Sequence, residues 1–289
     1  MKFSLYSQGR RIKEDFLLRQ FHEEETFGVF ESLRTYHGKI FREEEHLERL
    51  KESAKTMNVP TPIRISELKR ELRTALEAFY GARPQKGSDP SREDCFLRLT
   101  VWDGKIFVMI GQRRHSKSIY RTGVSLQTSP VRRTHPNAFS AQIKTTAYQN
   151  AVWASLAPSS AETYEWIFMD QEGYVTEVRI GNIFIVKGSD PTNRFGVRPQ
   201  LLTPPQTGIL NGVTRRVVIK CALQLRLEIQ ERPLTRHEIY NAEEAFLTNT
   251  SWEILPISKL DGRRIGRKIP GPVTSQLHRA FRKIVEQEC

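Results

Sequence analysis

Apolar and polar residues in the first part of the chain follow the pattern of a small domain of mixed helix and strand. They alternate before His37-Gly38, a pair typical of a hairpin turn. Leu47, Leu50 and Ala54 recur at helical spacing, which predicts a helix with one apolar face. The elements predicted on these grounds are a hairpin over residues 27–41, helices over 43–57 and 65–79, a loop over 81–91, and strands over 95–101 and 105–110.

The second part of the chain is richer in short strands. Its predicted strands lie near residues 124–128, 165–169, 174–178, 183–186, 226–230 and 245–248, and its predicted helices near 148–156, 214–225 and 273–287. Glu172-Gly173 and Asp261-Gly262 are typical of hairpin turns. Between the two parts the chain is polar, basic and without periodicity, which indicates an interdomain linker. We therefore predict a small N-terminal domain at 1–115, a linker at 116–121 and a larger domain at 122–289.

Length and composition restrict the class of protein. The chain has 289 residues, of which 38% are hydrophobic, enough to bury one large core or two ordinary ones. No apolar run approaches the roughly 20 residues that cross a bilayer, and no apolar signal segment opens the chain, so we expect a cytoplasmic protein without membrane contact. The three cysteines have neither zinc nor redox spacing, and no metal site is predicted.

The net charge of +12 raises the alternative of a basic nucleic-acid-binding protein. The basic clusters lie at residues 113–115, 132–133 and 263–268. Each is near a predicted turn, and no nucleic-acid recognition motif accompanies them, which favours solvated surface. The nucleic-acid alternative predicts salt-sensitive binding to DNA or RNA and no cofactor.

Lys144 and Glu177 form a pair that a pyridoxal phosphate enzyme requires. A lysine amine can form a Schiff base with the cofactor aldehyde. A carboxylate paired with the pyridine nitrogen keeps that nitrogen protonated, so that the ring accepts electrons from the substrate. Glu177 follows a predicted hairpin turn and precedes the strand that begins near Asn182, so it is placed to project from the edge of a sheet. Lys144 alone is more often a surface group, and Glu177 alone is as often an exposed strand residue as a functional one.

The cofactor phosphate needs backbone amides at a helix N-terminus and a cation. Residues 208–218 form a glycine loop through Gly212 that leads into a predicted helix, with Thr214 as the expected cap. Residues 248–251, which include Thr250, offer further hydroxyls and amides after a predicted strand. Arg49 is a candidate for the fixed positive charge.

Taken together, these segments resemble the class IV, fold type IV pyridoxal phosphate enzymes, which include branched-chain aminotransferases, D-amino-acid aminotransferases and aminodeoxychorismate lyase. The resemblance covers almost the whole chain. It rests on residues 28–38, 46–50, Lys144 with Tyr148 and Asn150, 177–184, 202–204, 208–215 and 246–256 in this order. It implies an α+β fold of a small mixed α/β domain and a larger β-rich α/β domain, with the cofactor in the cleft between them, and a homodimer.

The resemblance also implies a role for each matching residue. Lys144 would hold pyridoxal 5'-phosphate and move the proton between the substrate α-carbon and the cofactor, and Glu177 would contact the ring nitrogen. The remaining cofactor-binding positions would be Arg49, Tyr148, Gly212, the amides of Val213 and Thr214, and Thr250. In the substrate pocket, Arg98 lies where branched-chain enzymes carry the arginine of Tyr-x-Arg, with Phe96 in place of the tyrosine.

Phe30 and Phe96 would form an apolar wall suited to aliphatic side chains, with Ser251 and Trp252 completing the pocket. We therefore expect an aminotransferase that moves an amino group from an aliphatic, branched-chain L-amino acid to a keto acid, 2-oxoglutarate above all. A D-amino-acid aminotransferase and aminodeoxychorismate lyase remain alternatives, because all three activities share the Schiff base and differ in what the pocket admits.

Overall fold

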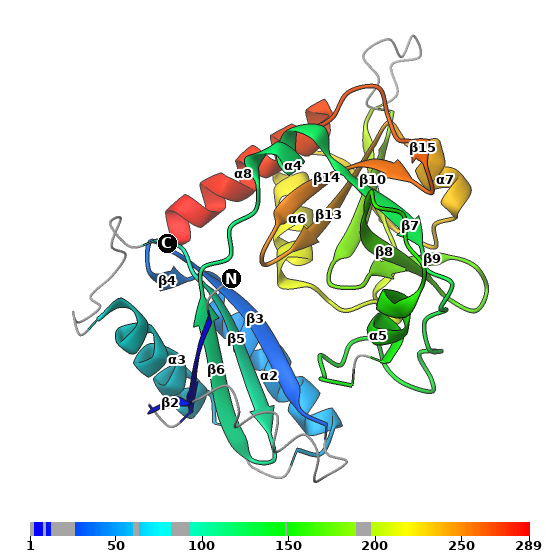
Figure 1. Ribbon diagram of the computed structural model, residues 1–289. Helices are drawn as coiled ribbons and strands as arrows, with labels where there is room; N and C mark the ends of the chain where they lie inside the picture. The colour runs from blue at the N-terminus through cyan, green and yellow to red at the C-terminus, as the bar shows by residue number, and fades with distance from the viewer. Residues whose placement is uncertain are drawn as a thin grey trace. The chain divides into compact units, whose positions relative to one another are not determined.

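The computed structural model describes residues 3–7, 10–12, 27–59, 64–81, 93–147, 149–188 and 198–289. The chain divides into two compact units (Figure 1). The first unit comprises residues 1–114, 143–147 and 285–289, and the second comprises 115–142 and 148–284. The division falls one residue before the predicted end of the small domain. However, the short segment that carries Lys144 belongs with the first unit, which the sequence did not predict.

A six-stranded antiparallel sheet forms the first unit, in the order β2-β1-β6-β5-β3-β4. Its strands are β1 (Phe3–Ser7), β2 (Arg10–Ile12), β3 (Val29–Tyr36), β4 (Lys39–Ile40), β5 (Phe96–Trp102) and β6 (Lys105–Gly111). Its helices are α2 (Glu43–Thr56) and α3 (Ile65–Tyr80). The predicted hairpin, both helices and both later strands are present, while the predicted loop at 81–91 lies almost entirely outside the described residues.

Side chains alternate between the two faces of this sheet because successive residues of a strand point to opposite sides. One set, which includes Val29, Leu33, Leu97 and Leu99, packs with Leu47 and other apolar residues of α2 and α3 into the core of the unit. The other set includes Phe30, Phe96 and Arg98 and so points away from that core. Three predicted substrate residues therefore share the face opposite the helices.

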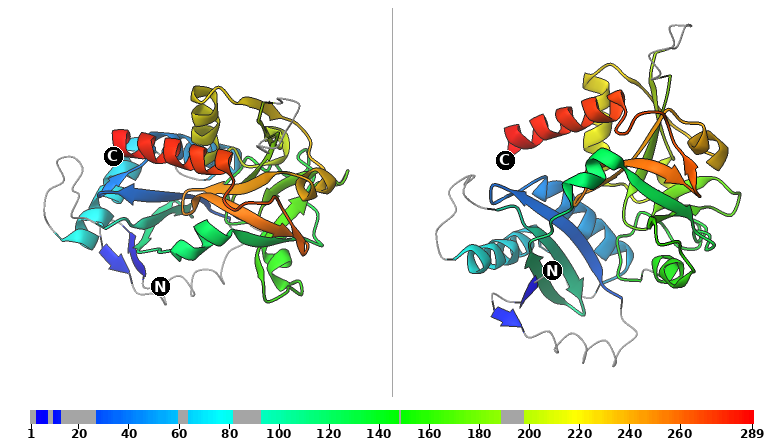
Figure 2. Two further views of the ribbon diagram at one scale, coloured as in Figure 1. Left: turned by 90° about the horizontal axis from the view of Figure 1, so that it is seen from above. Right: turned by 45° about the horizontal axis from the view of Figure 1, so that its top comes forward.

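The second unit contains a nine-stranded sheet in the order β12-β11-β10-β13-β14-β7-β8-β9, with β15 beside β14. Its strands are β7 (Val124–Thr128), β8 (Thr163–Met169), β9 (Val175–Val178), β10 (Asn182–Lys187), β11 (Gln200–Thr203), β12 (Glu228–Glu231), β13 (Glu244–Asn249), β14 (Glu253–Leu260) and β15 (Arg263–Arg264). The long strand β14 is orange in Figure 2. Ile183, Ile185, Leu247 and Leu255 lie in its main core.

Around this sheet lie the helices α4 (Lys117–Thr122), α5 (Gln149–Leu156), η1 (Gln206–Gly208), α6 (Val213–Gln224), α7 (Arg236–Tyr240) and α8 (Pro272–Glu288). The last residues of α8 are grouped with the first unit. None of the helices in the described part of the chain is both long and apolar enough to cross a membrane. The described residues also contain no group of three or more histidine, cysteine, aspartate or glutamate side chains arranged to hold a metal ion.

Two of the differences from the predicted elements have clear physical causes. Ser116 accepts a hydrogen bond from the Ser118 amide and caps α4, so residues predicted as linker form a short helix. Strand β14 was missed because Pro256 interrupts its pattern. In the structure Pro256 pairs with Phe246 of β13, and pairing with β7 starts one residue later at Ile257.

Candidate active site

Lys144 lies in a short segment that is fastened to the first unit by backbone hydrogen bonds. Its carbonyl accepts from the Phe30 amide at 3.0 Å, and its own amide donates to Ser53 Oγ at 3.1 Å. Thr146 N donates to the Gly28 carbonyl, and Thr146 Oγ1 accepts from Gly28 N. The result is an isolated bridge between Thr145 and Val29, at the start of β3. Lys144 is therefore held at a fixed place beside β3.

The Lys144 side chain lies over the ring of Phe30, on the sheet face opposite the helices. Its Nζ is 4.8 Å from the ring centroid, and Arg98 Cζ is 3.8 Å from the same centroid. Phe96, two residues from Arg98 on β5, lies under the guanidinium of Arg113. The first unit thus brings together the predicted Schiff-base lysine, the predicted carboxylate receptor and both predicted aromatic residues.

Arg49 is held by a buried ion pair that sequence reasoning missed. Its Nε donates to Glu31 Oε1 at 2.6 Å and its NH2 group donates to Oε2 at 2.7 Å. His46 Nδ1 also bonds Oε2, at 2.8 Å. His46 and Arg49 are three residues apart on α2, and Glu31 occupies an inward position of β3, fully buried. A glutamate at an inward strand position was the available signal for this cluster.

Protonation in this cluster follows from burial and charge. Burial alone would raise the pKa of Glu31, but the Arg49 guanidinium and the bonds from His46 and Arg49 outweigh it and hold that pKa well below its ordinary value of 4.5. Burial lowers the pKa of His46, against the opposing effect of its bond to Glu31. His46 is therefore neutral at pH 7 and donates its Nδ1 proton to an ionised Glu31, because a carboxylate can only accept. The cluster fixes the Arg49 side chain.

In the second unit, Glu177 is buried on β9 and its carboxylate meets three donors. Oε1 forms a short ion pair with Arg133, and Oε2 accepts from the Leu210 amide at 3.1 Å and from Asn182 Nδ2 at 3.4 Å. Asn182 Nδ2 also donates to the Leu210 carbonyl at 2.9 Å. The predicted acid is thus joined to the glycine loop before α6. The expectation that Arg133 is solvated surface is wrong, because its side chain is 18% exposed and pairs with Glu177.

The N-terminus of α6 has the form of an anion site. Thr214 is not the cap, as the sequence suggested, because α6 starts at Val213 and its N-cap is Gly212. The N-cap is a glycine, which has no side chain to bond the first turn, and the amides of a helix N-terminus are suited to bind an anion. A Cβ on Gly212 would lie 2.2 Å from Asn182 Oδ1, so the close approach requires glycine. These features fit the phosphate of pyridoxal phosphate.

The loop between β13 and β14 carries Thr250, Ser251 and Trp252. Asn249 Oδ1 accepts from the amides of Ser251 and Trp252 at 2.9 and 2.6 Å, and Asn249 Nδ2 donates to the Ile180 carbonyl at 3.0 Å. The loop is thereby tied to the turn that follows β9. Thr248 Oγ1, at the end of β13, is buried without a hydrogen-bond partner in the part of the chain that the structure describes.

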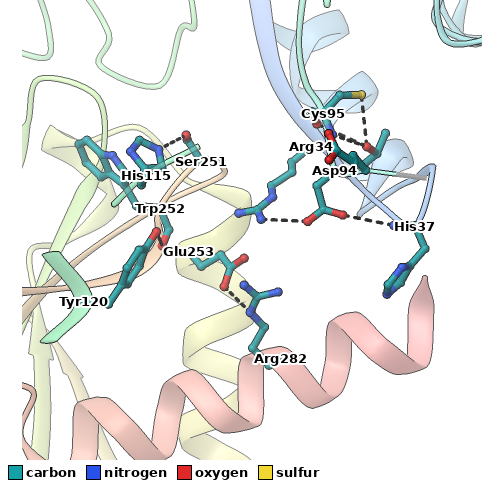
Figure 3. A network of polar contacts seen from close by, with 12 residues as sticks. Arg34, His37, Asp94, Cys95, His115, Tyr120, Ser251, Trp252, Glu253 and Arg282 are labelled. Carbon is teal, nitrogen blue, oxygen red and sulfur yellow. Dashed lines mark hydrogen bonds and ion pairs between the residues drawn. The ribbon is translucent and has the colours of Figure 1, made fainter. Parts of the chain in front are cut away.

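His115 and Tyr120 hold the same loop from another side (Figure 3). His115 Nε2 lies 2.7 Å from Ser251 Oγ, and the Tyr120 hydroxyl donates to the Trp252 carbonyl at 3.2 Å. The Trp252 ring is buried in the core, against Tyr164. Figure 3 also shows the ion pair between Glu253 and Arg282, 2.7 Å long. Ser251 and Trp252 stay predicted substrate residues, and Tyr148 lies outside the described residues.

Comparison with known proteins identifies the family of this chain. The sequence pattern of the family described as "Amino-transferase class IV" matches residues 28–260. The chain belongs to this family. The branched-chain-amino-acid aminotransferase of Pseudomonas aeruginosa is 32% identical over 275 residues, which is 89% of this chain and 84% of that protein.

Two solved structures of branched-chain aminotransferases are similar to this chain over nearly its whole length. The branched-chain aminotransferase of Thermobaculum terrenum in its PLP-form has a TM-score of 0.80 and 25% identity, over 99% of this chain and 94% of that chain. The enzyme of Thermoproteus uzoniensis with norvaline has a TM-score of 0.76 and 29% identity, over 99% and 95%. The predictions of a fold type IV, pyridoxal phosphate-dependent transaminase are confirmed.

Proposed function

We propose that this class IV aminotransferase moves an amino group from an aliphatic, branched-chain L-amino acid to 2-oxoglutarate. The observation that carries the proposal is the arrangement around the Phe30 ring. The Lys144 amine lies 4.8 Å and the Arg98 guanidinium carbon 3.8 Å from the centroid of this ring. Such a face offers a reacting amine, an aliphatic contact and a partner for a carboxylate. The names of the similar proteins support the same substrate class.

The roles of the residues are part of the proposal. Pyridoxal phosphate supplies an electron sink when bound. Lys144 anchors it and moves the proton at the substrate α-carbon, and Glu177 holds the proton of the ring nitrogen. Arg49, Gly212, the amides of Val213 and Thr214, and Thr250 bind the phosphate, and Tyr148 bonds near the ring hydroxyl or Lys144. Phe30, Phe96, Arg98, Ser251 and Trp252 bind the substrate.

Replacing Glu177 with glutamine is expected to leave the cofactor bound and to lower kcat by about 10²–10³-fold, since a neutral amide does not hold a proton on the ring nitrogen. A cofactor titration measures the affinity for pyridoxal phosphate, and rapid mixing with substrate measures the rate of proton transfer. Glu172→Gln, at the exposed hairpin turn before β9, is the matched control. An unchanged proton-transfer rate in Glu177→Gln would remove Glu177 from this role.

Substrate comparison tests the proposed reaction. The purified enzyme is given 2-oxoglutarate with L-leucine, L-valine or D-alanine, and glutamate formation is measured. We expect turnover with the two L-amino acids and much less with D-alanine. The reverse order would establish the D-amino-acid alternative. Pyruvate released from aminodeoxychorismate in place of glutamate formation would establish the lyase alternative.

We also propose that the protein is a homodimer. Helix α5 exposes three large apolar side chains, Val152, Trp153 and Leu156, at 56%, 62% and 70%. An apolar group of this kind on a soluble protein marks an interaction surface. Light scattering is expected to give twice the chain mass of 33.5 kDa, and Trp153→Glu is expected to shift the mass toward that of one chain. A monomer in the unaltered protein would contradict the proposal. The cytoplasmic location stays a prediction.

A further inference from the structure

Glu253, the first residue of β14, has a backbone conformation that is unusual for its residue type. Its φ is 62°, in the left-handed region that favours glycine. The other described non-glycine residues with a positive φ are partly or fully exposed, whereas Glu253 is buried. It pairs with Asn249 and so closes the loop 250–252. A strained residue of this kind persists only where its surroundings hold it, and such residues cluster at functional sites.

Two side chains of α8 bind the Glu253 carboxylate. Its Oε2 accepts from His278 Nε2 at 3.0 Å and from Arg282 Nε at 2.7 Å (Figure 3 shows the second bond). His278 and Arg282 are four residues apart on the helix, so they reach the same oxygen from one face. The Glu253 side chain is only 2% exposed, and charge-assisted hydrogen bonds are stronger than neutral ones. These bonds hold the carboxylate and with it the left-handed backbone of Glu253.

The peptide unit before Glu253 is held as well. The Tyr120 hydroxyl donates to the Trp252 carbonyl at 3.2 Å, and the Tyr120 ring stacks on His278 with the ring centroids 5.9 Å apart. The torsion φ of Glu253 sets the direction of this carbonyl relative to the rest of β14. His278 therefore contacts both groups that fix how the loop joins the strand. The loop carries Thr250, the hydroxyl assigned to the cofactor phosphate.

We propose that Glu253, held by His278 and Arg282, is a positioning residue for the site of the cofactor phosphate. Its carboxylate keeps the left-handed backbone that directs the loop 250–252 and so places the Thr250 hydroxyl. The inference rests on the proposed function, which assigns Thr250 to the phosphate. A loop that relaxed at Glu253 would weaken the hold on the phosphate. The reaction of Lys144 with the cofactor aldehyde would persist, because Lys144 lies on a separate segment of the chain.

Cofactor binding to the apoenzyme of Glu253→Ala tests the inference. Alanine loses both bonds to α8 and is disfavoured at this φ, so the affinity for pyridoxal 5'-phosphate is expected to fall by about 10-fold or more. The affinity for pyridoxal, which has no phosphate, is expected to change by less than about 3-fold. Glu253→Gly also loses the bonds but adopts this φ without strain, and is expected to bind pyridoxal 5'-phosphate about 3-fold or more tightly than Glu253→Ala does. Equal losses for the two ligands, or equal affinities of the two variants, would overturn the inference.

Arg282→Gln gives a second readout, which serves if thermal unfolding shows that Glu253→Ala does not fold. The Arg282 side chain is 46% exposed, and His278 still binds the carboxylate in this variant. We expect a loss of about 3- to 10-fold in affinity for pyridoxal 5'-phosphate, with recovery in Arg282→Lys, which keeps the charge. Lys283→Gln, the exposed neighbour on α8, is the control and is expected to stay within about 2-fold of wild type. A loss in Arg282→Gln no larger than in the control would overturn the inference.

The same titrations separate this inference from the proposed function. A wild-type apoenzyme that bound pyridoxal as tightly as pyridoxal 5'-phosphate would refute the phosphate site of the proposed function, and the inference with it. A wild-type preference for pyridoxal 5'-phosphate that persisted in Glu253→Ala would refute the positioning role of Glu253 alone.

Discussion

Replacing Lys144 with alanine is expected to lower transamination by at least about 10⁴-fold. The amine both attaches the cofactor and transfers the substrate proton, and general acid–base catalysis alone contributes about 10²–10⁴-fold. Lys144→Ala leaves the backbone bonds of the segment to Phe30 and Ser53 in place, so the fold is expected to persist. Turnover of L-leucine, with the thermal unfolding temperature measured beside it, checks both statements.

Lys51→Ala is the matched control for Lys144→Ala. Lys51 lies on α2 in the same unit, is exposed, and is expected to change turnover by less than about 2-fold, because it lies outside the groups assigned to catalysis. A Lys144→Ala enzyme that retained the visible absorbance of covalently attached cofactor and its turnover would refute the assignment of the catalytic lysine.

Glu31→Gln is expected to destabilise the protein by about 3–5 kcal/mol at pH 7. The substitution preserves size but removes the negative charge that compensates Arg49, and an uncompensated buried charge carries a cost of this order. Both partners are almost fully buried, with Glu31 at 0% and Arg49 at 7% exposed. Urea unfolding followed by circular dichroism measures the loss. Glu48→Gln, on the exposed face of α2, is the control and is expected to fall within about 0.5 kcal/mol of wild type.

The stability lost in Glu31→Gln should depend on pH. Because Arg49 and His46 hold the pKa of Glu31 below its ordinary 4.5 despite burial, the unfolded chain takes up the Glu31 proton at a higher pH than the folded protein. The contribution of the ionised carboxylate is therefore complete above about pH 4.5 and is lost as pH falls further. The difference in unfolding free energy between wild type and Glu31→Gln is expected to shrink below pH 4.5. A difference that grew on acidification would contradict the assignment.

Local sequence patterns were sufficient to predict the strands and helices that carry the candidate active-site residues. Alternation predicted the hairpin of β3 and β4, and helical spacing predicted α2, which presents Arg49. A glycine loop before an amphipathic run predicted α6. In the structure this loop precedes the helix, and the Leu210 amide in it donates to Glu177. These features depend on neighbours within a few residues, and such neighbours are visible in a sequence.

Long-range contacts could not be predicted in the same way. The segment around Lys144 joins the first unit by an isolated bridge to Val29, more than one hundred residues earlier, and no periodicity records such a pair. Arg133 belonged to a basic cluster that suggested solvated surface until its contact with Glu177 was seen. Likewise, Thr214 is a residue type typical of an N-cap, but α6 starts at Val213 and its N-cap is Gly212, which lies against Asn182 where a Cβ would not fit.

The central claim, that Lys144 and its surroundings make this chain a pyridoxal phosphate transaminase of aliphatic L-amino acids, is tested most directly by visible absorbance. The purified enzyme is mixed with L-leucine in the absence of any keto acid, and the spectrum is followed. We predict that the visible band of the bound cofactor disappears as the pyridoxamine form accumulates, and that added 2-oxoglutarate restores it. A band that is present but unchanged by L-leucine would contradict the assigned substrate class, and a purified protein that cannot acquire such a band would contradict the account as a whole.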